Sequence, residues 1–142
     1  MDTTYFADIR TAVINAVKTS KNIKHVYGHE GAEFAGIPAS IVVPTDNQSE
    51  YNSSANDKLT YVFKIVTYYQ IKEGGVDWEK AEEALIKVID ELTSIFRSRV
   101  VLGSACDWLT PVPSVWGYEE RGAGVYRTAE LTLRCIKYAP KL

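Results

Sequence analysis

The chain has few of the residues that mark a disulfide-rich or metal-binding protein. Of its 142 residues, two are cysteines, Cys106 and Cys135, and two are histidines. The cysteines have no Cys-x-x-Cys spacing, so we expect neither a zinc site nor a disulfide framework but two free thiols. His25 and His29 stand four residues apart, but Gly28 interrupts any helix that would bring both onto one face. We therefore expect no metal and no cofactor.

An excess of charge of one sign is also missing. Sixteen Lys and Arg against eighteen Asp and Glu give a net charge of -2, so bulk charge does not favour nucleic acid or an anionic membrane as partner. No apolar run approaches the roughly 18 residues that cross a bilayer. The first eight residues carry acids where a secretory signal would carry Lys or Arg. We expect no membrane association and no secretion.

Enzyme motifs are missing too. The chain has no Gly-x-Ser-x-Gly, P-loop or Gly-x-Gly-x-x-Gly pattern, and Gly122-Ala-Gly124 lies in a predicted turn. A nucleophilic triad would have to use one of two histidines from a single glycine-containing segment. The paired acids at 82–83, 90–91 and 119–120 are typical of helix surfaces and turns. We predict that the protein is not an enzyme.

What is present is the composition of one globular domain, with 46% hydrophobic and 24% charged residues. A chain of this length builds one core without staples, so we treat residues 1–142 as a single domain. Helical spacing of apolar residues predicts a helix over 4–18, capped by Asp2, Thr3 or Thr4. A second, acidic helix is predicted from its cap Asp77 to about Arg99, with Trp78 in its buried stripe and Glu91 in an exposed ion pair.

Alternation of apolar and polar residues predicts the strands. Extended segments are expected over 37–44, 58–72, 107–118 and 125–138, with a short extended piece at 23–27 inside a loop. Pro111 and Pro113 place segment 107–118 at a sheet edge. A long polar loop over 45–57 and a turn over 119–124 complete the chain. The fold class is α+β: an antiparallel sheet of two hairpins with helices packed on one face, in the order α-β-β-α-β-β.

Segment 58–72 is apolar on both faces. One face carries residues such as Phe63 and Ile65, and the other carries Val62, Val66 and Tyr68. Something must cover part of this second face, either a helix of the same chain or a neighbouring subunit.

The layout resembles the tail terminator proteins of long-tailed bacteriophages, the family of the lambda tail terminator. The resemblance rests on the initial helix, the Ile37-Pro-Ala-Ser-Ile-Val-Val43 strand, the polar loop and long strand, the acidic helix, and the closing Trp116-Gly-Tyr-Glu-Glu-Arg … Tyr126-Arg-Thr-Ala-Glu-Leu-Thr-Leu-Arg-Cys-Ile-Lys-Tyr138 hairpin. It covers nearly the whole chain in order, without a catalytic signature. The segment at 22–36 and the proline-rich stretch at 109–113 depart from the family pattern.

This resemblance implies a structural virion protein of the tail or neck, assembled in the host cytoplasm. Such proteins form a sixfold ring on the last ring of tail tube protein, end tube polymerisation and offer a docking surface to the head or neck. A ring of this kind forms through head-to-tail contacts between copies. DNA would pass through its lumen without specific binding, which a slightly acidic chain suits.

Two sets of residues are candidates for these contacts. The subunit interface is expected to use apolar residues of segment 58–72 and aromatics of the closing hairpin: Val62, Val66, Tyr68, Trp116, Tyr118 and Tyr126. The alternative is that these side chains only fill gaps within one subunit. Docking to tube or neck is expected to use the polar loop and the turn: Asp46, Glu50, Tyr51, Glu119, Glu120 and Arg121.

Two other functions remain open at this point. One is a neck or head-tail completion protein of the connector. The other is a cellular α+β module that dimerises through its sheet and binds a small ligand or a peptide.

Overall fold

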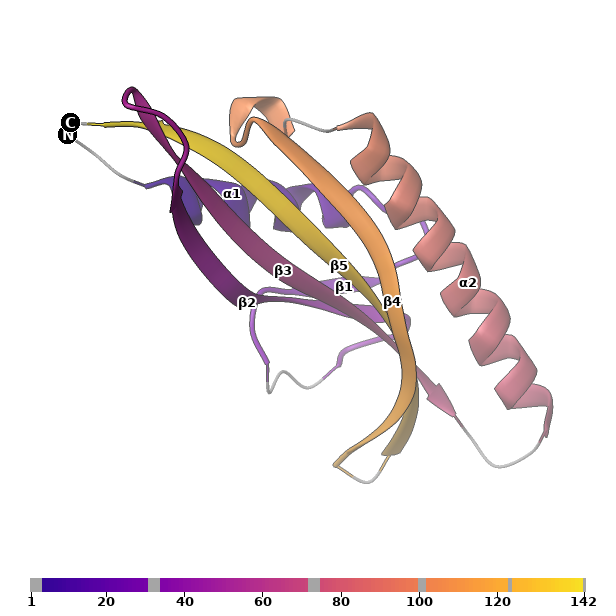
Figure 1. The fold of residues 1–142 in the computed structure, drawn as a ribbon. Coiled ribbons are helices and arrows are strands. Elements are labelled where there is room, and N and C mark those ends of the chain that lie inside the picture. Colours follow the sequence, from indigo (N-terminus) through magenta and orange to yellow (C-terminus); the bar gives the residue numbers. More distant parts are fainter. Residues whose placement is uncertain (1–3, 31–33, 72–74, 100–101, 123, 142) are drawn as a thin grey trace.

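The computed structural model describes residues 4–30, 34–71, 75–99, 102–122 and 124–141. Two helices and a short 3-10 turn accompany one elongated, curved sheet (Figure 1). In chain order the elements are α1 (Tyr5–Lys18), β1 (His25–Tyr27), β2 (Ala39–Tyr51), β3 (Asn56–Ile71), α2 (Gly75–Ser98), η1 (Leu102–Ser104), β4 (Trp108–Arg121) and β5 (Gly124–Pro140).

The sheet is mixed rather than purely antiparallel. Its strand order is β1-β2-β3-β5-β4. β2 with β3, β3 with β5 and β5 with β4 pair antiparallel, whereas β1 runs parallel to β2. The expected α-β-β-α-β-β order therefore gains a strand, and that strand is the short extended piece predicted at 23–27. The α+β class is confirmed.

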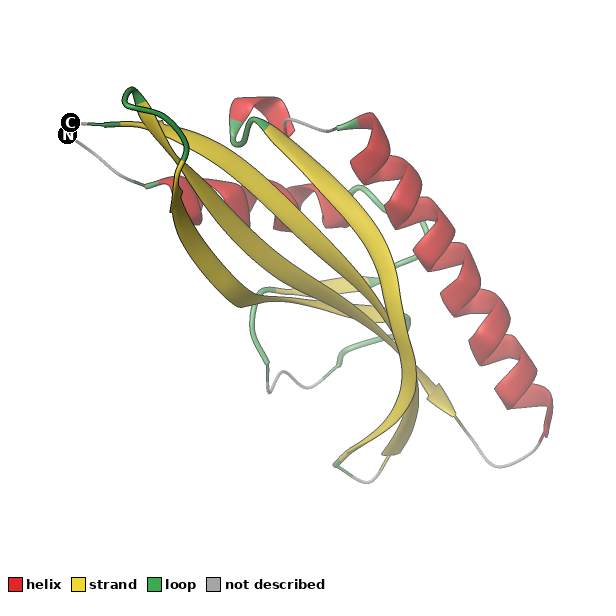
Figure 2. Ribbon diagram, in the orientation of Figure 1, coloured by secondary structure: helices red, strands yellow, loops and turns green. Residues whose placement is uncertain are grey.

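Both helices cover the same face of the sheet, and the core lies between these layers (Figure 2). α1 contributes a stripe that includes Ile9 and Val13, and α2 one that includes Leu85 and Leu92, all fully buried. These side chains recur at helical spacing, so burial of one stripe holds each helix on the sheet. The strands supply alternate residues to the same core: Val42, Phe63, Ile65, Ala129, Leu131, Leu133 and Cys135.

Details at the helix ends differ from the expectations. Trp78 is 46% exposed rather than part of the buried stripe of α2. That helix begins at Gly75, so Asp77 lies inside its first turn and not at the expected cap position. For α1, the expected caps Asp2 and Thr3 lie outside the described residues. Thr4 occupies the cap position of α1, but its hydroxyl donates to the Asp8 carboxylate at 2.9 Å instead of bonding a backbone amide.

The predicted polar loop over 45–57 is mostly strand. β2 continues past Pro44 through a bulge at Thr45, and Asp46–Tyr51 then pair with residues 57–62 of β3. Polar residues persist in a strand here because this end of β2 is a sheet edge exposed to water. Only residues 52–55 connect the two strands. We call residues 46–57 the arm; it comprises the outer part of β2, the connection, and the first residues of β3.

β4 is the edge strand that the prolines predicted. Pro111 and Pro113 pair with Leu133 and Leu131, positions a proline can hold when its nitrogen faces away from the neighbouring strand. A register shift follows between Pro113 and Trp116. The expected turn at 119–124 is shorter, because β4 runs to Arg121 and β5 begins at Gly124. Within the described residues, no helix has the length and apolar character to cross a membrane.

Candidate interaction surface

An aromatic cluster lies on the open face of the sheet, the face opposite the helices. Phe34, from the segment between β1 and β2, sits 4.9 Å from Tyr68 and 5.5 Å from Tyr126, measured between ring centroids. The Tyr27 ring centroid lies 5.7 Å from that of Phe34. The Arg121 guanidinium carbon lies 4.8 Å from the Phe34 ring and 5.2 Å from the Tyr68 ring, within cation–π range. We call these five residues the open-face cluster.

The open-face cluster takes up part of the surface that the sequence offered for subunit contact, around Val66 and Tyr68. Val66 and Tyr68 are 7% and 6% exposed, because Phe34 and its neighbours cover them. The cover predicted for the second face of segment 58–72 is thus a loop residue of the same chain, and neither helix provides it. Tyr126 and Val62 remain half-buried on this face. Little of Val66 and Tyr68 is left for a second copy to touch.

Burial also changes the acidity of Tyr68. Loss of water around its hydroxyl, followed by a hydrogen bond to the Glu119 carboxylate, raises the pKa of Tyr68 well above its usual range. Oε2 of Glu119 lies 3.7 Å from Nη1 of Arg121, so the carboxylate interacts with both the Tyr68 hydroxyl and the Arg121 guanidinium. Glu119 and Arg121 therefore help close the open-face cluster, and Glu120 stays exposed beside them.

A second cluster lies on the helix side, where β4 meets the start of α2. Arg127 of β5 is its centre: its Nη1 donates to the Gly117 carbonyl at 3.0 Å, and its Nη2 lies 3.5 Å from Glu82 Oε1. Its guanidinium carbon sits 4.5 Å from the Tyr118 ring and 5.1 Å from the Trp116 ring. Within the described residues, Arg127 Nε is buried without a hydrogen-bond partner.

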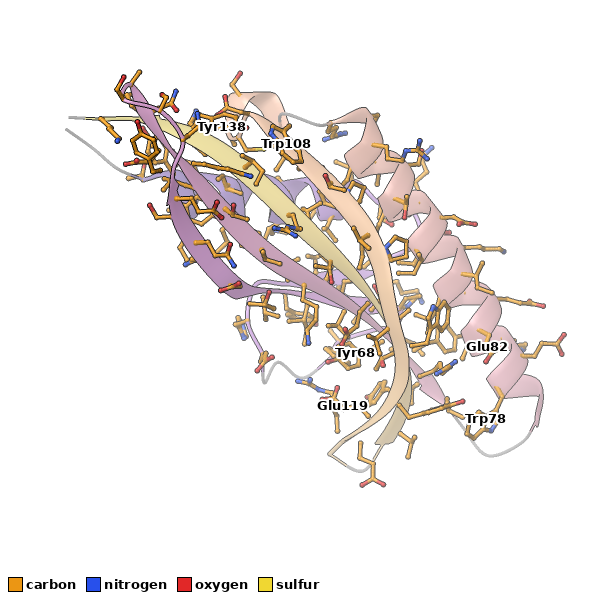
Figure 3. The ribbon with its side chains drawn as sticks, viewed as in Figure 1. Tyr68, Trp78, Glu82, Trp108, Glu119 and Tyr138 are labelled. Atoms are coloured by element: carbon orange, nitrogen blue, oxygen red, sulfur yellow. The ribbon has the colours of Figure 1, made fainter. Side chains whose placement is uncertain are left out.

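This second cluster is open to solvent. Trp78 packs on Tyr118 with ring centroids 5.5 Å apart, and Figure 3 places Trp78 and Glu82 at the N-terminal end of α2. The three aromatic side chains are 46%, 36% and 54% exposed for Trp78, Trp116 and Tyr118. We call these residues, with Arg127 and Glu82, the edge cluster. Large aromatics around an ordered arginine are the side chains that carry most binding energy in protein interfaces.

The arm carries the docking candidates Asp46, Glu50 and Tyr51, all exposed. Tyr51 is 73% exposed, and the Lys141 ammonium lies 4.2 Å from its ring centroid. The structure thus presents these three residues on a paired strand rather than on a loop. A strand costs less entropy to order on a partner than a loop does.

Two shallow hollows lie near the clusters. One, of about 300 Å³, lies on the open face between Lys64, Tyr68, Val115, Glu119 and Glu130. The other, of about 390 Å³, lies between α2 and the segments on either side of β1. This second hollow, which we call the lysine hollow, is lined by Asn22, Lys24, Ile37, Pro38, Tyr69, Lys80, Glu83, Ala84 and Lys87.

Sequence reasoning placed neither Arg127 nor Phe34 in a functional role. Arg127 was hidden because its role depends on the register that sets it opposite Tyr118. The structure pairs Arg121 with Gly124, and so short a connection fixes the pairing of the two strands, whereas the sequence predicted a longer turn over 119–124. Phe34 carried no such signal, because its position over Tyr68 depends on the path of a loop.

The cysteines and histidines are the remaining candidates for a chemical role. Cys106 and Cys135 are buried thiols that are not joined in a disulfide. A hydrogen bond between the two thiols lowers the pKa of Cys106 and, together with burial, raises that of Cys135. His25 stacks on Tyr27, and the described residues contain no group of three metal-ligating side chains. No protein-family model matches the chain, and no curated protein matches it.

Proposed function

We propose that the protein is a structural, non-enzymatic component of a phage virion that forms a ring and caps the tail tube. The observation that carries this proposal is the resemblance of the sequence pattern, in order over nearly the whole chain, to tail terminator proteins. The element order of the structure supports it, as do the β2–β3 and β4–β5 pairs on either side of α2, which correspond to the two hairpins of this layout.

The edge cluster supports a contact between copies. Trp116 and Tyr118 expose apolar area beside the free edge of β4, whereas Val66 and Tyr68 are buried within one copy. We therefore assign the larger share of the subunit contact to Trp116, Tyr118 and Trp78, with Val62 and Tyr126 at most at its margin. Exposed aromatics that a partner desolvates gain free energy roughly in proportion to the area removed from water.

The ring would end tube polymerisation and offer a surface to the neck or head. Glu119, Glu120 and Arg121, at the end of β4, are the docking segment proposed for the tube or neck. DNA would pass through the lumen, and the near-neutral charge of the chain favours passage over binding. The ring is sixfold in the family that the chain resembles.

Light scattering and negative-stain images of the purified chain, alone and mixed with the tail tube protein of the same phage, test this function. We expect a ring in at least one sample. The double variant Trp116→Ala, Tyr118→Ala should keep the circular dichroism of the wild type and lose the ring. A ring that ignores the tube protein would favour a neck or connector protein, and a strict dimer would favour the cellular binding module.

A further inference from the structure

The two ends of the molecule carry complementary surfaces. The arm lies at one end of β3 and the lysine hollow at the other, since residues 57–62 pair with the arm while Tyr69 lines the hollow. In Figure 1 the turn between β2 and β3 and the start of α2 lie at opposite ends of the fold. From Lys58 to Tyr69, β3 spans about 35 Å at the usual rise per residue. A copy therefore cannot place its own arm in its own hollow.

The charges of the two surfaces are opposite. The lysine hollow has three lysines against one glutamate: Lys24, Lys80 and Lys87 against Glu83. The outer strand of the arm, residues 46–51, has Asp46 and Glu50 and no Lys or Arg. With Lys58 and Lys141 included, the arm still has three carboxylates against two lysines, because Asp57 is its third acid and pairs with Lys141 at 3.5 Å.

Geometry agrees with this pairing. The hollow, of about 390 Å³, is lined by the three lysines and by Ile37, Pro38, Ala84 and Tyr69, and it accommodates one or two side chains. Side chains of a strand alternate between its two faces, so Asp46 and Glu50 lie on one face of the arm and Tyr51 lies on the other. The two carboxylates can therefore face the lysines of one hollow together.

The edge cluster is a poorer match for the arm. Its free edge is bordered by the acids Glu82, Glu119 and Glu120, and its arginine is already engaged by Glu82 and Gly117. Like charges across an interface disfavour association. Charge thus selects the lysine hollow over the edge cluster as the place where an acidic arm binds.

We infer that the arm of one copy, through the carboxylates of Asp46 and Glu50, binds at the lysine hollow of the next copy, rather than docking on the tube or neck. The contact joins different surfaces on the two copies, so it repeats from copy to copy and closes a ring when the rotation allows. This inference rests on the proposed ring. It adds a second pair of surfaces that joins the copies besides the edge-cluster contact, and it predicts that salt weakens their association.

Two charge-reversal variants test the contact. The hollow variant, Lys80→Glu with Lys87→Glu, and the arm variant, Asp46→Lys with Glu50→Lys, each place like charges on both sides. Each alone should lower the association constant by about tenfold or more at 0.1 M salt. An equimolar mixture should restore the ring, because in an alternating arrangement every interface again joins opposite charges. A control, Lys18→Glu with Lys21→Glu, changes the net charge equally outside the hollow and should assemble as the wild type does.

Assembly is measured by light scattering under the condition in which the wild type forms rings, with circular dichroism to confirm that each variant is folded. If folded single variants assemble normally, or if their mixture stays unassembled, the arm contact is wrong while the proposed function stands. If the wild type forms no ring with or without tube protein, the proposed function fails and this inference fails with it. Restoration in the mixture supports both.

Discussion

Two arginines of the same strand pair occupy similar surroundings on opposite faces of the sheet. Arg121 lies over Phe34 and Tyr68, and Arg127 lies over Trp116 and Tyr118. Each guanidinium stands within about 5 Å of two rings and pairs with a glutamate. Their local chemistry is nearly the same, yet Tyr68 is 6% exposed and Tyr118 is 54% exposed.

The difference comes from what lies above each arginine. On the open face, the segment between β1 and β2 returns over the sheet and places Phe34 on Tyr68. On the helix side, α2 contributes Trp78 and Glu82 beside the rings, but Trp116 and Tyr118 remain 36% and 54% exposed. An aromatic–arginine group that its own chain covers stabilises the fold. The same group left open is available to a partner.

The largest expected effect is a difference in the free energy of unfolding between variants of the two clusters. Tyr68→Ala removes a buried ring from the open-face cluster and should lower the free energy of unfolding by roughly 3 kcal/mol. Tyr118→Ala removes a half-exposed ring and should cost below about 1 kcal/mol. Urea denaturation of both variants, followed by circular dichroism, measures the two losses.

Assembly should reverse this order. At a temperature where both variants are folded, Tyr118→Ala should weaken association more than Tyr68→Ala does. Equal losses of stability in the two variants would show that the edge cluster is part of the folding core, and the comparison would then collapse.

The sequence predicted which face of the sheet each residue of β3 occupies, but it did not predict whether that face is covered. The alternation in β3 assigned Phe63 and Ile65 to the core and Val66 and Tyr68 to the opposite face, and both assignments are confirmed. A period of two determines which face a residue occupies but says nothing about what covers that face. The cover depends on where Phe34 lies, and the sequence around Phe34 has no periodicity, so the burial of Tyr68 could not be predicted.

At the arm, the secondary-structure prediction itself was wrong, because a loop was expected where the structure has mostly strand. Residues 45–57 are rich in Asp, Asn and Ser, which favour turns when they are considered alone. The structure extends β2 to Tyr51 because β3 already offers a long ladder of partners. Tertiary pairing therefore overrode local propensity. Trp78 was also misassigned, because it packs on the half-exposed Tyr118 of the edge strand β4 and stays 46% exposed.

Two glutamates of α2 offer a second comparison, with expected effects of intermediate size: one accepts several hydrogen bonds and the other has an ion pair. Glu91 accepts hydrogen bonds from the Ser20 hydroxyl and from the Lys21 and Asn22 amides, the last two at 3.0 and 3.4 Å, instead of forming the exposed ion pair expected from the sequence. Glu82 has one ion pair and a side chain that is 54% exposed. Glu91→Gln should cost about 1 kcal/mol at neutral pH, and Glu82→Gln less than about 0.5 kcal/mol.

The Glu91 contribution should also depend on pH. Burial opposes its ionisation, but the hydrogen bonds outweigh burial and lower the pKa of Glu91. A carboxyl group with a lowered folded-state pKa stabilises the fold above its unfolded pKa of about 4.3, and this contribution is lost as pH falls through the folded value. Denaturation curves from pH 7 to pH 3 should show the wild type and Glu91→Gln converging. A constant difference would mean that Glu91 acts through packing instead.

The smallest expected effect concerns the hydroxyl of Tyr68. Tyr68→Phe keeps the ring and removes the hydrogen bond to Glu119, so at neutral pH it should cost about 0.5–1 kcal/mol. Because burial and Glu119 raise the folded-state pKa of Tyr68, the wild type keeps this contribution below the unfolded pKa of about 10 and loses it as pH rises toward the folded value. The two proteins should therefore approach equal stability above pH 10, where ionisable groups that they share affect both alike. Tyr118→Phe, at a half-exposed ring, serves as the control. If the difference between wild type and Tyr68→Phe is unchanged above pH 10, the open-face cluster does not shield the hydroxyl, and the contrast between a covered and an open aromatic–arginine group loses its electrostatic basis.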